Sequence, residues 1–256
     1  MKAYAMECGW ITGDRSGFIA GAEGRIRVPV PVFFIDHPKG RVLFDAGPHP
    51  HAATDPRGRL GFLAGLFDIH LGESELVSSR LASVDVDVAR IDHLVLSHLH
   101  FDHAGGVELV PNARIVVQKL EWEAGADPEL SARCSFDRRD FDLGHDVMLV
   151  DGEHDLFGDG RVVLLPTHGH TPGHQSMRLR LDDGREVVVC SDACYLKENL
   201  DRMTLPSVVF RKTTMMESLE RLAAMREAGA TMIYGHDPSE WPSVPLAPRL
   251  LDDRVR

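Results

Sequence analysis

Residues 98–106 read His98-Leu99-His100-Phe101-Asp102-His103-Ala104-Gly105-Gly106, and this stretch decides how the rest of the chain is interpreted. Its first six residues hold four potential metal ligands. Imidazole and carboxylate groups together form a ligand set that binds Zn²⁺ and similar borderline metals. In an extended backbone His98, His100 and Asp102 point to one face, because side chains alternate along a strand, while His103 points elsewhere. The run therefore predicts two adjacent metal positions rather than one, an arrangement suited to hydrolysis.

The composition is that of a globular protein without a basic surface. The chain has 256 residues, 43% of them hydrophobic, so we expect one domain spanning residues 1–256. A formal net charge of −11 gives no electrostatic footprint for nucleic acid or an anionic membrane. The sequence has no run of about 18 apolar residues, so we expect no membrane span. We also expect no signal peptide, because the first residues have no long apolar core.

The four cysteines have no metal-binding or disulfide spacing. No CxxC pair or regular framework is visible, so we expect reduced thiols and a cytoplasmic location. They are Cys8, Cys134, Cys190 and Cys194.

Apolar runs and turn signals outline the secondary structure. Strands are predicted over residues 28–36, 41–44, 91–96, 114–118, 162–165, 176–181, 186–190 and 231–234. Helices are predicted over residues 73–83 and from Thr214 to about Gly229, the second opened by a capping box of Thr214 and Glu217. Residues 48–60, rich in Pro, Gly and His, predict a loop. Strands interspersed with helices favour helices on the outer faces of packed sheets.

Three later segments offer further ligands where a predicted strand stops. They are Thr167–His174, Ser191–Ala193 and Gly235–Asp237. Loops that follow strands are the usual place for sites held by a rigid scaffold. The first of these segments offers two rival ligands, His168 and His170. The remaining histidines are expected to have structural roles, as lone histidines usually do; these are His37, His49, His51, His70, His93, His145 and His154.

Together these motifs resemble the metallo-β-lactamase superfamily, over about residues 28–236. The resemblance implies an α/β fold of the αββα type, a sandwich with a dinuclear metal site at one edge of its sheets. The family places a ligand just before Thr-Pro-Gly-His, which favours His170 over His168 and leaves His174 to shape the loop and orient ligands. The implied ligands are His98, His100 and His170 for the first metal, Asp102, His103 and His236 for the second, and Asp192 bridging the two.

Within the superfamily, three stretches look like the N-acyl homoserine lactonases, which are quorum-quenching enzymes. They are residues 97–106, 171–176 and 192–199. The resemblance implies that Tyr195, three residues after Asp192, contacts the substrate, and Phe101 is expected near it. Cys194 departs from the family, which often has Ser there, but this leaves the ligands untouched.

The resemblance implies hydrolysis of the lactone ring of N-acyl homoserine lactones by a metal-bridging hydroxide. Tyr195 would hydrogen-bond the carbonyl oxygen, and Asp102 would carry a proton to the leaving ring oxygen. Two Zn²⁺ ions are the expected cofactors, although the ligands also suit Co²⁺, Mn²⁺ or Fe. The expected partner is a small-molecule substrate, with neither nucleic acid nor membrane. A homodimer fits the family, in which the region matching residues 1–24 contributes dimer contacts.

Other activities share this ligand set. An ester, thioester or organophosphate hydrolase of the superfamily remains an alternative. A glyoxalase-II-like thioesterase would carry a helical extension, whereas twenty residues with four prolines follow His236. A β-lactamase would more often have Cys in place of Asp192. A nuclease of the superfamily would have a basic surface. A zinc-holding structural or sensor protein is the non-enzyme alternative. Residues 60–67, unusually apolar, predict either a wall for an acyl chain or a helix packed on the core.

Overall fold

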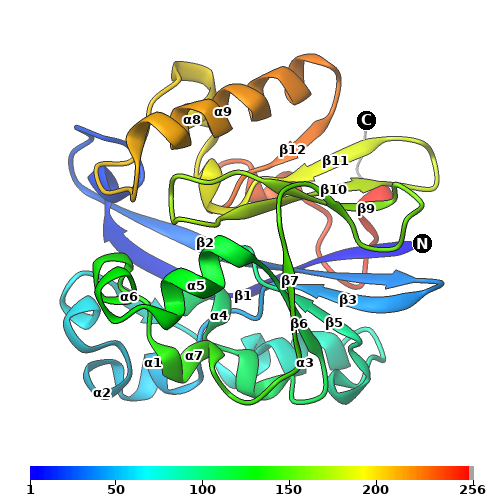
Figure 1. Cartoon of the computed structure of the whole chain (residues 1–256), viewed down its shortest axis with the longest axis horizontal. Coiled ribbons are helices and arrows are strands. Elements are labelled where there is room, and N and C mark those ends of the chain that lie inside the picture. Colours follow the sequence, from blue (N-terminus) through cyan, green and yellow to red (C-terminus); the bar gives the residue numbers. More distant parts are fainter. Residues whose placement is uncertain (254–256) are drawn as a thin grey trace.

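Two β-sheets pack face to face, with helices on both outer sides (Figure 1). The computed structural model describes residues 1–253. The first sheet has the strand order β4-β1-β2-β3-β5-β6-β7, and the second has the order β12-β11-β10-β9-β8. The strands are β1 (Lys2–Asp14), β2 (Arg25–His37), β3 (Gly40–Phe44), β4 (Asp68–His70), β5 (His93–Val95), β6 (Arg114–Gln118), β7 (Val147–Val150), β8 (His154–Asp155), β9 (Val162–Pro166), β10 (Gln175–Arg180), β11 (Glu186–Val189) and β12 (Thr231–Ile233).

The helices form the outer layers, so the expected αββα arrangement is confirmed (Figure 1). Helices α8 (Lys197–Arg202) and α9 (Lys212–Glu227) pack on the second sheet through Leu200, Leu219 and Leu222. The remaining helices lie on the side of the first sheet. They are α1 (His51–Thr54), α2 (Pro56–Leu60), α3 (Val77–Ala82), α4 (Phe101–Ala104), α5 (Lys119–Ala126), α6 (Pro128–Cys134) and α7 (Arg138–Phe141).

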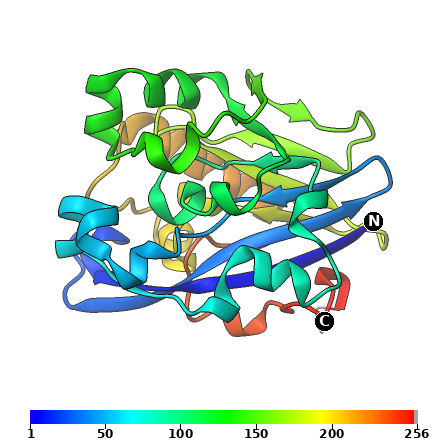
Figure 2. The ribbon, with the colours of Figure 1, turned by 90° about the horizontal axis from the view of Figure 1, so that it is seen from below.

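The alternation of side chains along the strands separates the inner core from the outer one. Phe33 and Ile35 of β2 point between the sheets and meet Leu164 and Met177 of the second sheet. Phe34, the residue between them, belongs instead to the core beneath the outer helices. A strand that is apolar on both faces fits a position buried on both sides. Residues 1–24, for which the sequence predicted no element, contain β1, which pairs with β2 along the first sheet (Figure 2).

Parallel strand pairs bring the candidate site together at one edge. In the first sheet β3 runs parallel to β5, and in the second β11 runs parallel to β12. The carboxyl ends of parallel neighbours meet at the same edge, where open α/β sheets usually carry their sites. Asp45, at the end of β3, donates its backbone N–H to Val95 O at the end of β5 (2.9 Å). The sequence segments that follow these strands are therefore neighbours in space.

Several predicted elements differ from the structure. Residues 48–60 are not a plain loop, because Asp55 accepts the Gly58 N–H and opens α2. The helix predicted over residues 73–83 is interrupted at Leu76, whose backbone is extended (ψ 144°). The capping box of Thr214 and Glu217 is wrong, since α9 begins earlier, at Lys212, without a side-chain cap. Within residues 1–253 no helix is long and apolar enough to cross a bilayer.

Candidate metal centre

The backbone changes conformation in the middle of the ligand run. It is extended at His100 (φ −71°, ψ 156°) and becomes helical at Phe101, where α4 begins. Leu99 points into the apolar core and is fully buried, so His98 and His100 face the opposite way. The assumption that Asp102 shares a face with these two histidines is wrong, because Asp102 lies in the helical turn.

The structure brings all seven sequence-predicted ligands together in two clusters. Within each cluster the candidate ligand atoms lie within 4.8 Å of one another. This division matches the one that the family resemblance implies, while metal binding itself stays a prediction. The first cluster contains His98, His100, His170 and Asp192, and the second contains Asp102, His103 and His236.

The Asp192 carboxylate lies between the two clusters. Its Oδ2 is 3.4 Å from His98 Nε2 and 3.3 Å from His170 Nε2. Its Oδ1 is 3.3 Å from His103 Nε2 and 3.1 Å from His236 Nε2. One oxygen therefore faces each cluster, which is the geometry that a bridging carboxylate requires.

Backbone carbonyls fix the protonation of two imidazoles. His100 Nε2 donates to Cys134 O at 2.8 Å, and His236 Nδ1 donates to Pro29 O at 2.7 Å. A carbonyl oxygen can only accept, so each of these ring nitrogens carries the proton. In the neutral ring the other nitrogen then turns a lone pair toward its cluster, which is how partners outside a metal site usually orient a histidine ligand.

Asp45 plays the same part for two further histidines. Its Oδ2 accepts the His103 Nδ1–H at 2.9 Å and the Ser97 hydroxyl at 2.8 Å. Because Ser97 gives its proton to Asp45, its oxygen accepts from His98 Nδ1 at 2.9 Å. One buried carboxylate therefore orients an imidazole in each cluster. Asp45 itself has a left-handed backbone (φ +64°), which an aspartate tolerates better than most residues.

The contacts inside the clusters fit metal ions. His98 Nε2 and His170 Nε2 lie 2.9 Å and 3.0 Å from His100 Nδ1. Facing lone pairs repel at this distance unless a cation lies between them, and ligands of a tetrahedral Zn²⁺ are about 3.3 Å apart. In the second cluster His103 Nε2 and the facing Asp192 Oδ1 are buried without a hydrogen-bond partner. A metal ion bound by these two atoms would satisfy both of them.

Charge at the two clusters is distributed unequally. Burial lowers the pKa of His98 and His170 well below the usual value, so both rings are neutral and free to ligate. Burial also opposes charge on His103, but Asp192, Asp102 and Asp45 outweigh it and raise its pKa well above the usual value. In the absence of metal the second cluster therefore retains a proton, which a metal ion must displace.

Glu121 holds the two main ligand loops together. This carboxylate on α5 is fully buried and accepts the Leu99 N–H at 3.1 Å and the Gly173 N–H at 2.7 Å. Leu99 lies between two candidate ligands, and Gly173 follows His170 in the other loop. A Cβ on Gly173 would come within 2.2 Å of Glu121 N, so only glycine permits this approach. Burial raises the pKa of Glu121 to about 7, against the effect of these hydrogen bonds.

His168 and His174, the two other histidines of this loop, lie outside both clusters. His168 turns away from the clusters, with Nδ1 3.1 Å from His174 O. His174 is buried, and its Nε2 accepts the Asp192 backbone N–H at 3.1 Å. His174 therefore positions the bridging carboxylate rather than joining either cluster.

A cavity of about 530 Å³ opens onto both clusters. Tyr195 lines it, with its hydroxyl 3.3 Å from His170 Nδ1. Phe101 lines it as well and packs against Phe67, with ring centroids 5.9 Å apart. Residues 60–67 meet both expectations: Phe62 and Leu66 line the cavity and are 70% and 54% exposed, whereas Leu60 is buried in an apolar core. An apolar wall beside polar groups is typical of small-molecule sites.

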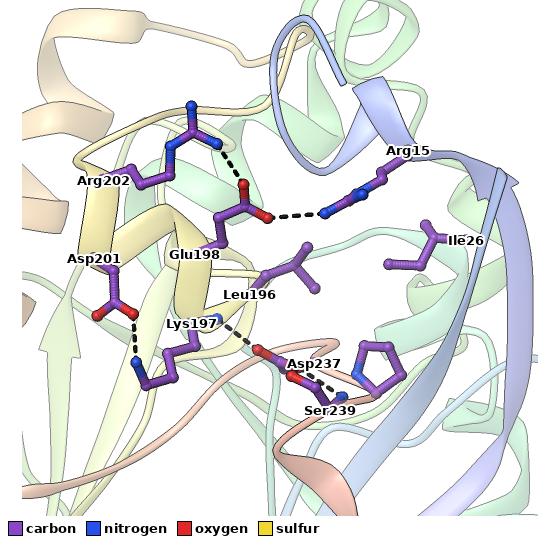
Figure 3. Close-up of a pocket in the computed structure, with 10 residues that line it drawn as sticks. Arg15, Ile26, Leu196, Lys197, Glu198, Asp201, Arg202, Asp237 and Ser239 are labelled. Atoms are coloured by element: carbon purple, nitrogen blue, oxygen red, sulfur yellow. Dashed lines mark hydrogen bonds and ion pairs between the residues drawn. The ribbon is translucent and has the colours of Figure 1, made fainter. Parts of the chain in front are cut away.

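A second cavity, of about 460 Å³, adjoins the segments that carry Tyr195 and His236. Glu198 lies between Arg15 and Arg202 (Figure 3) and pairs with them at 2.9 Å and 2.5 Å. Because these charged groups satisfy one another, they brace the segments next to the metal centre.

Comparisons with known proteins agree with this geometry. Residues 25–236 match the family model described as the metallo-beta-lactamase superfamily. The chain is 34% identical over 234 residues to the N-acyl homoserine lactonase AttM of Azorhizobium caulinodans, covering 88% of each chain. It is 27% identical over 230 residues to the N-acyl homoserine lactonase AiiA of Bacillus thuringiensis subsp. kurstaki, again covering 88% of each.

Among solved structures, an N-acyl homoserine lactone hydrolase is similar over nearly its whole length. It superposes with a TM-score of 0.87 at 26% identity, covering 97% of this chain and 98% of the other. That structure holds the product N-hexanoyl-L-homoserine at its catalytic metal centre.

Proposed function

This chain belongs to the metallo-beta-lactamase superfamily, and we propose that it hydrolyses the lactone ring of N-acyl homoserine lactones. The observation that carries the proposal is the Asp192 carboxylate with one oxygen toward each histidine cluster, at the end of a largely apolar cavity that Tyr195 lines. The lactonase relatives, which align over 88% of the chain, support the same substrate class.

We propose two Zn²⁺ ions as the resident metals. His98, His100 and His170 would hold one and Asp102, His103 and His236 the other, with Asp192 shared. A metal pair at such a site supplies a nucleophile from water near neutral pH and polarises a carbonyl oxygen. Nitrogen-rich ligand sets of this kind suit zinc, while Co²⁺, Mn²⁺ and Fe are chemically compatible.

Tyr195 is the proposed donor to the lactone carbonyl oxygen. Burial and then the negative charges of Asp192 and Asp102 raise the pKa of its hydroxyl well above the usual value. The hydroxyl therefore keeps its proton throughout the working pH range. It donates a hydrogen bond that strengthens as the carbonyl oxygen gains negative charge, an effect typically worth a few kcal/mol.

Asp102 is the proposed proton carrier. Ring opening breaks the bond between the carbonyl carbon and the ring oxygen, and the leaving oxygen must receive a proton. The Asp102 side chain lines the cavity, with Oδ2 3.5 Å from His103 Nε2 and 3.6 Å from His236 Nε2. It stands between the metal centre and the substrate space, where it can pass a proton from the attacking water to the ring oxygen.

The test is ring opening of N-hexanoyl and N-decanoyl homoserine lactone by metal-loaded protein, followed by proton release. We expect turnover by the wild type and a loss of about a hundredfold or more in Asp102→Asn. The control is Asp155→Asn, because Asp155 lies beside the start of β9, away from the end that leads to His170. This substitution should leave turnover unchanged. Absence of lactone turnover despite bound metal would contradict the proposal and favour a thioester or phosphotriester substrate.

The other expectations remain predictions. We propose a cytoplasmic location, because the four cysteines are free, buried thiols. The single domain, its homodimerisation and the absence of a nucleic-acid partner also stay predictions.

A further inference from the structure

Arg133, at the end of α6, is the one arginine or lysine among the described residues that line the active-site cavity. It is exposed, and its guanidinium lies over the Phe210 ring at 4.4 Å from the centroid. Its Nη2 donates to Phe210 O at 3.1 Å. Within the described part of the chain it has no carboxylate partner, in contrast to the paired Arg59 or Arg202. Most of its five N–H donors therefore remain free for a ligand.

The residues next to Arg133 and beneath its guanidinium are in contact with the metal centre. The next residue, Cys134, accepts the His100 Nε2–H through its carbonyl oxygen at 2.8 Å. Phe210, on which the guanidinium rests, donates its backbone N–H to His170 O at 3.0 Å. Arg133 thus stands beside two segments that each contact a histidine of the first cluster. Phe62 and Leu66, on the wall formed by residues 60–67, supply apolar surface elsewhere in the cavity.

We propose that Arg133 is a specificity-determining residue that hydrogen-bonds the amide carbonyl oxygen of the substrate's acyl arm. The inference rests on the proposed lactonase function. With the lactone carbonyl at the metal centre beside Tyr195, the amide oxygen lies three bonds from the ring α-carbon, before the hydrocarbon chain begins. A free guanidinium that lines the cavity beside the segments of His100 and His170 can donate to that oxygen, while the alkyl chain continues along the apolar wall. A charged donor to a carbonyl oxygen favours lactones that carry an acyl amide over lactones with a plain alkyl arm.

The experiment compares two substrates of matched length, N-hexanoyl homoserine lactone and α-heptyl-γ-butyrolactone, which lacks the amide. For Arg133→Met we expect KM for the amide substrate to rise about tenfold or more with kcat nearly unchanged. Turnover of the alkyl lactone should stay within about twofold of the wild type. Arg133→Lys keeps the charge without the planar fork and should show a smaller loss.

Arg211→Met is the matched control. Arg211 also lies near the Phe210 ring, at 5.9 Å, but it does not line the cavity. It should not change the preference between the two substrates.

Three outcomes would overturn the inference. An unchanged substrate ratio in Arg133→Met would show that the guanidinium does not contact the amide. Equal losses on both substrates would assign Arg133 a structural role through Cys134 and Phe210. With the β-oxo derivative of the amide substrate assayed as a third substrate, a loss confined to it would assign the contact to the β-oxygen instead. Failure of the wild type to open any acyl homoserine lactone would contradict the proposed function itself, which separates the two tests.

Discussion

Replacing Asp45 by Asn should weaken metal binding at both clusters without touching a proposed ligand. The substitution keeps the size of the side chain, and Asn also tolerates the left-handed backbone at this position. The Asn oxygen can still accept the Ser97 N–H, which lies 2.7 Å from Asp45 Oδ1. The new amide group, however, replaces Oδ2 and turns two hydrogens toward the His103 ring and the Ser97 hydroxyl.

The consequence is a change of tautomer in two imidazoles. His103 Nδ1 now faces a donor at 2.9 Å, so Nδ1 carries the lone pair and the ring proton stays on Nε2, the atom that would bind metal. Ser97 no longer gives its proton to position 45 and gives it instead to His98 Nδ1, at 2.9 Å. Removing one such orienting partner typically weakens metal binding about 10- to 100-fold. We therefore expect about 100-fold weaker binding overall, or about 2.7 kcal/mol.

The assay is a competitive titration with a chromophoric chelator, with the imidazole nitrogen chemical shifts followed in the metal-free protein. Asp155→Asn is the control, since that carboxylate accepts backbone N–H groups from Phe157, Gly158 and Gly160 and contacts no candidate ligand among residues 1–253. Wild-type affinity in Asp45→Asn, with a folded protein and unchanged imidazole shifts, would refute the idea that Asp45 sets the tautomers.

Three further predictions follow from the same contacts. Tyr195→Phe should lower kcat about 100-fold with unchanged metal content by elemental analysis, and unchanged kcat would remove Tyr195 from the reaction. The pKa of Glu121 is raised to about 7, so the folded state holds a proton that the unfolded state loses near pH 4.5. The free energy of unfolding of the wild type should thus fall relative to that of Glu121→Gln, by about 3 kcal/mol, as the pH rises from about 4.5 to about 7. Urea titrations of the metal-free proteins measure this difference, and a difference that stays constant with pH would contradict the prediction. Chelation of the metal should abolish turnover and lower the melting temperature. Metal affinity should also weaken as the pH falls, because a metal ion must displace the proton that His103 holds, and calorimetric titration at two pH values would check this.

The candidate ligands could be predicted from the sequence because their signal is local. His98, His100 and His103 stand within one short run, and Asp192 and His236 each lie three positions after the end of an apolar strand. Strand ends meet at a sheet edge whatever the detailed packing is, so the prediction needed no three-dimensional detail. The family resemblance then divided these residues between two positions, and the structure groups them in the same way.

The supporting residues could not be found by the same route. Asp45 and Glu121 contact the ligand loops across 22 to 58 residues of sequence, and neither belongs to a recognisable motif. The one available hint was an acidic residue directly after the apolar strand that ends at Phe44, where a buried charge needs a partner. Arg133 gave no hint at all, since an isolated arginine at the end of a short helix is ordinary.

Local conformation was the other source of error. The run from His98 was expected to be uniformly extended, but Leu99 packs into the core and the backbone turns into α4 at Phe101. Asp102 consequently joins the second cluster and not the first. The long strand β1 escaped prediction because its residues alternate irregularly, and a shift in register between Glu7 and Trp10 breaks the period of two.

Because each sheet supplies only some of the ligands, the chain can bind its full set of metal ions only late in synthesis. The first sheet presents His98 and His100 early, but His236 follows β12, the last strand of the second sheet. A nascent chain still lacking that segment can offer an incomplete second cluster at most. Full metal loading therefore requires contacts between distant parts of the sequence, which form slowly. Once loaded, the ions would tie the two layers together, so the rate of metal release would report how often the layers separate.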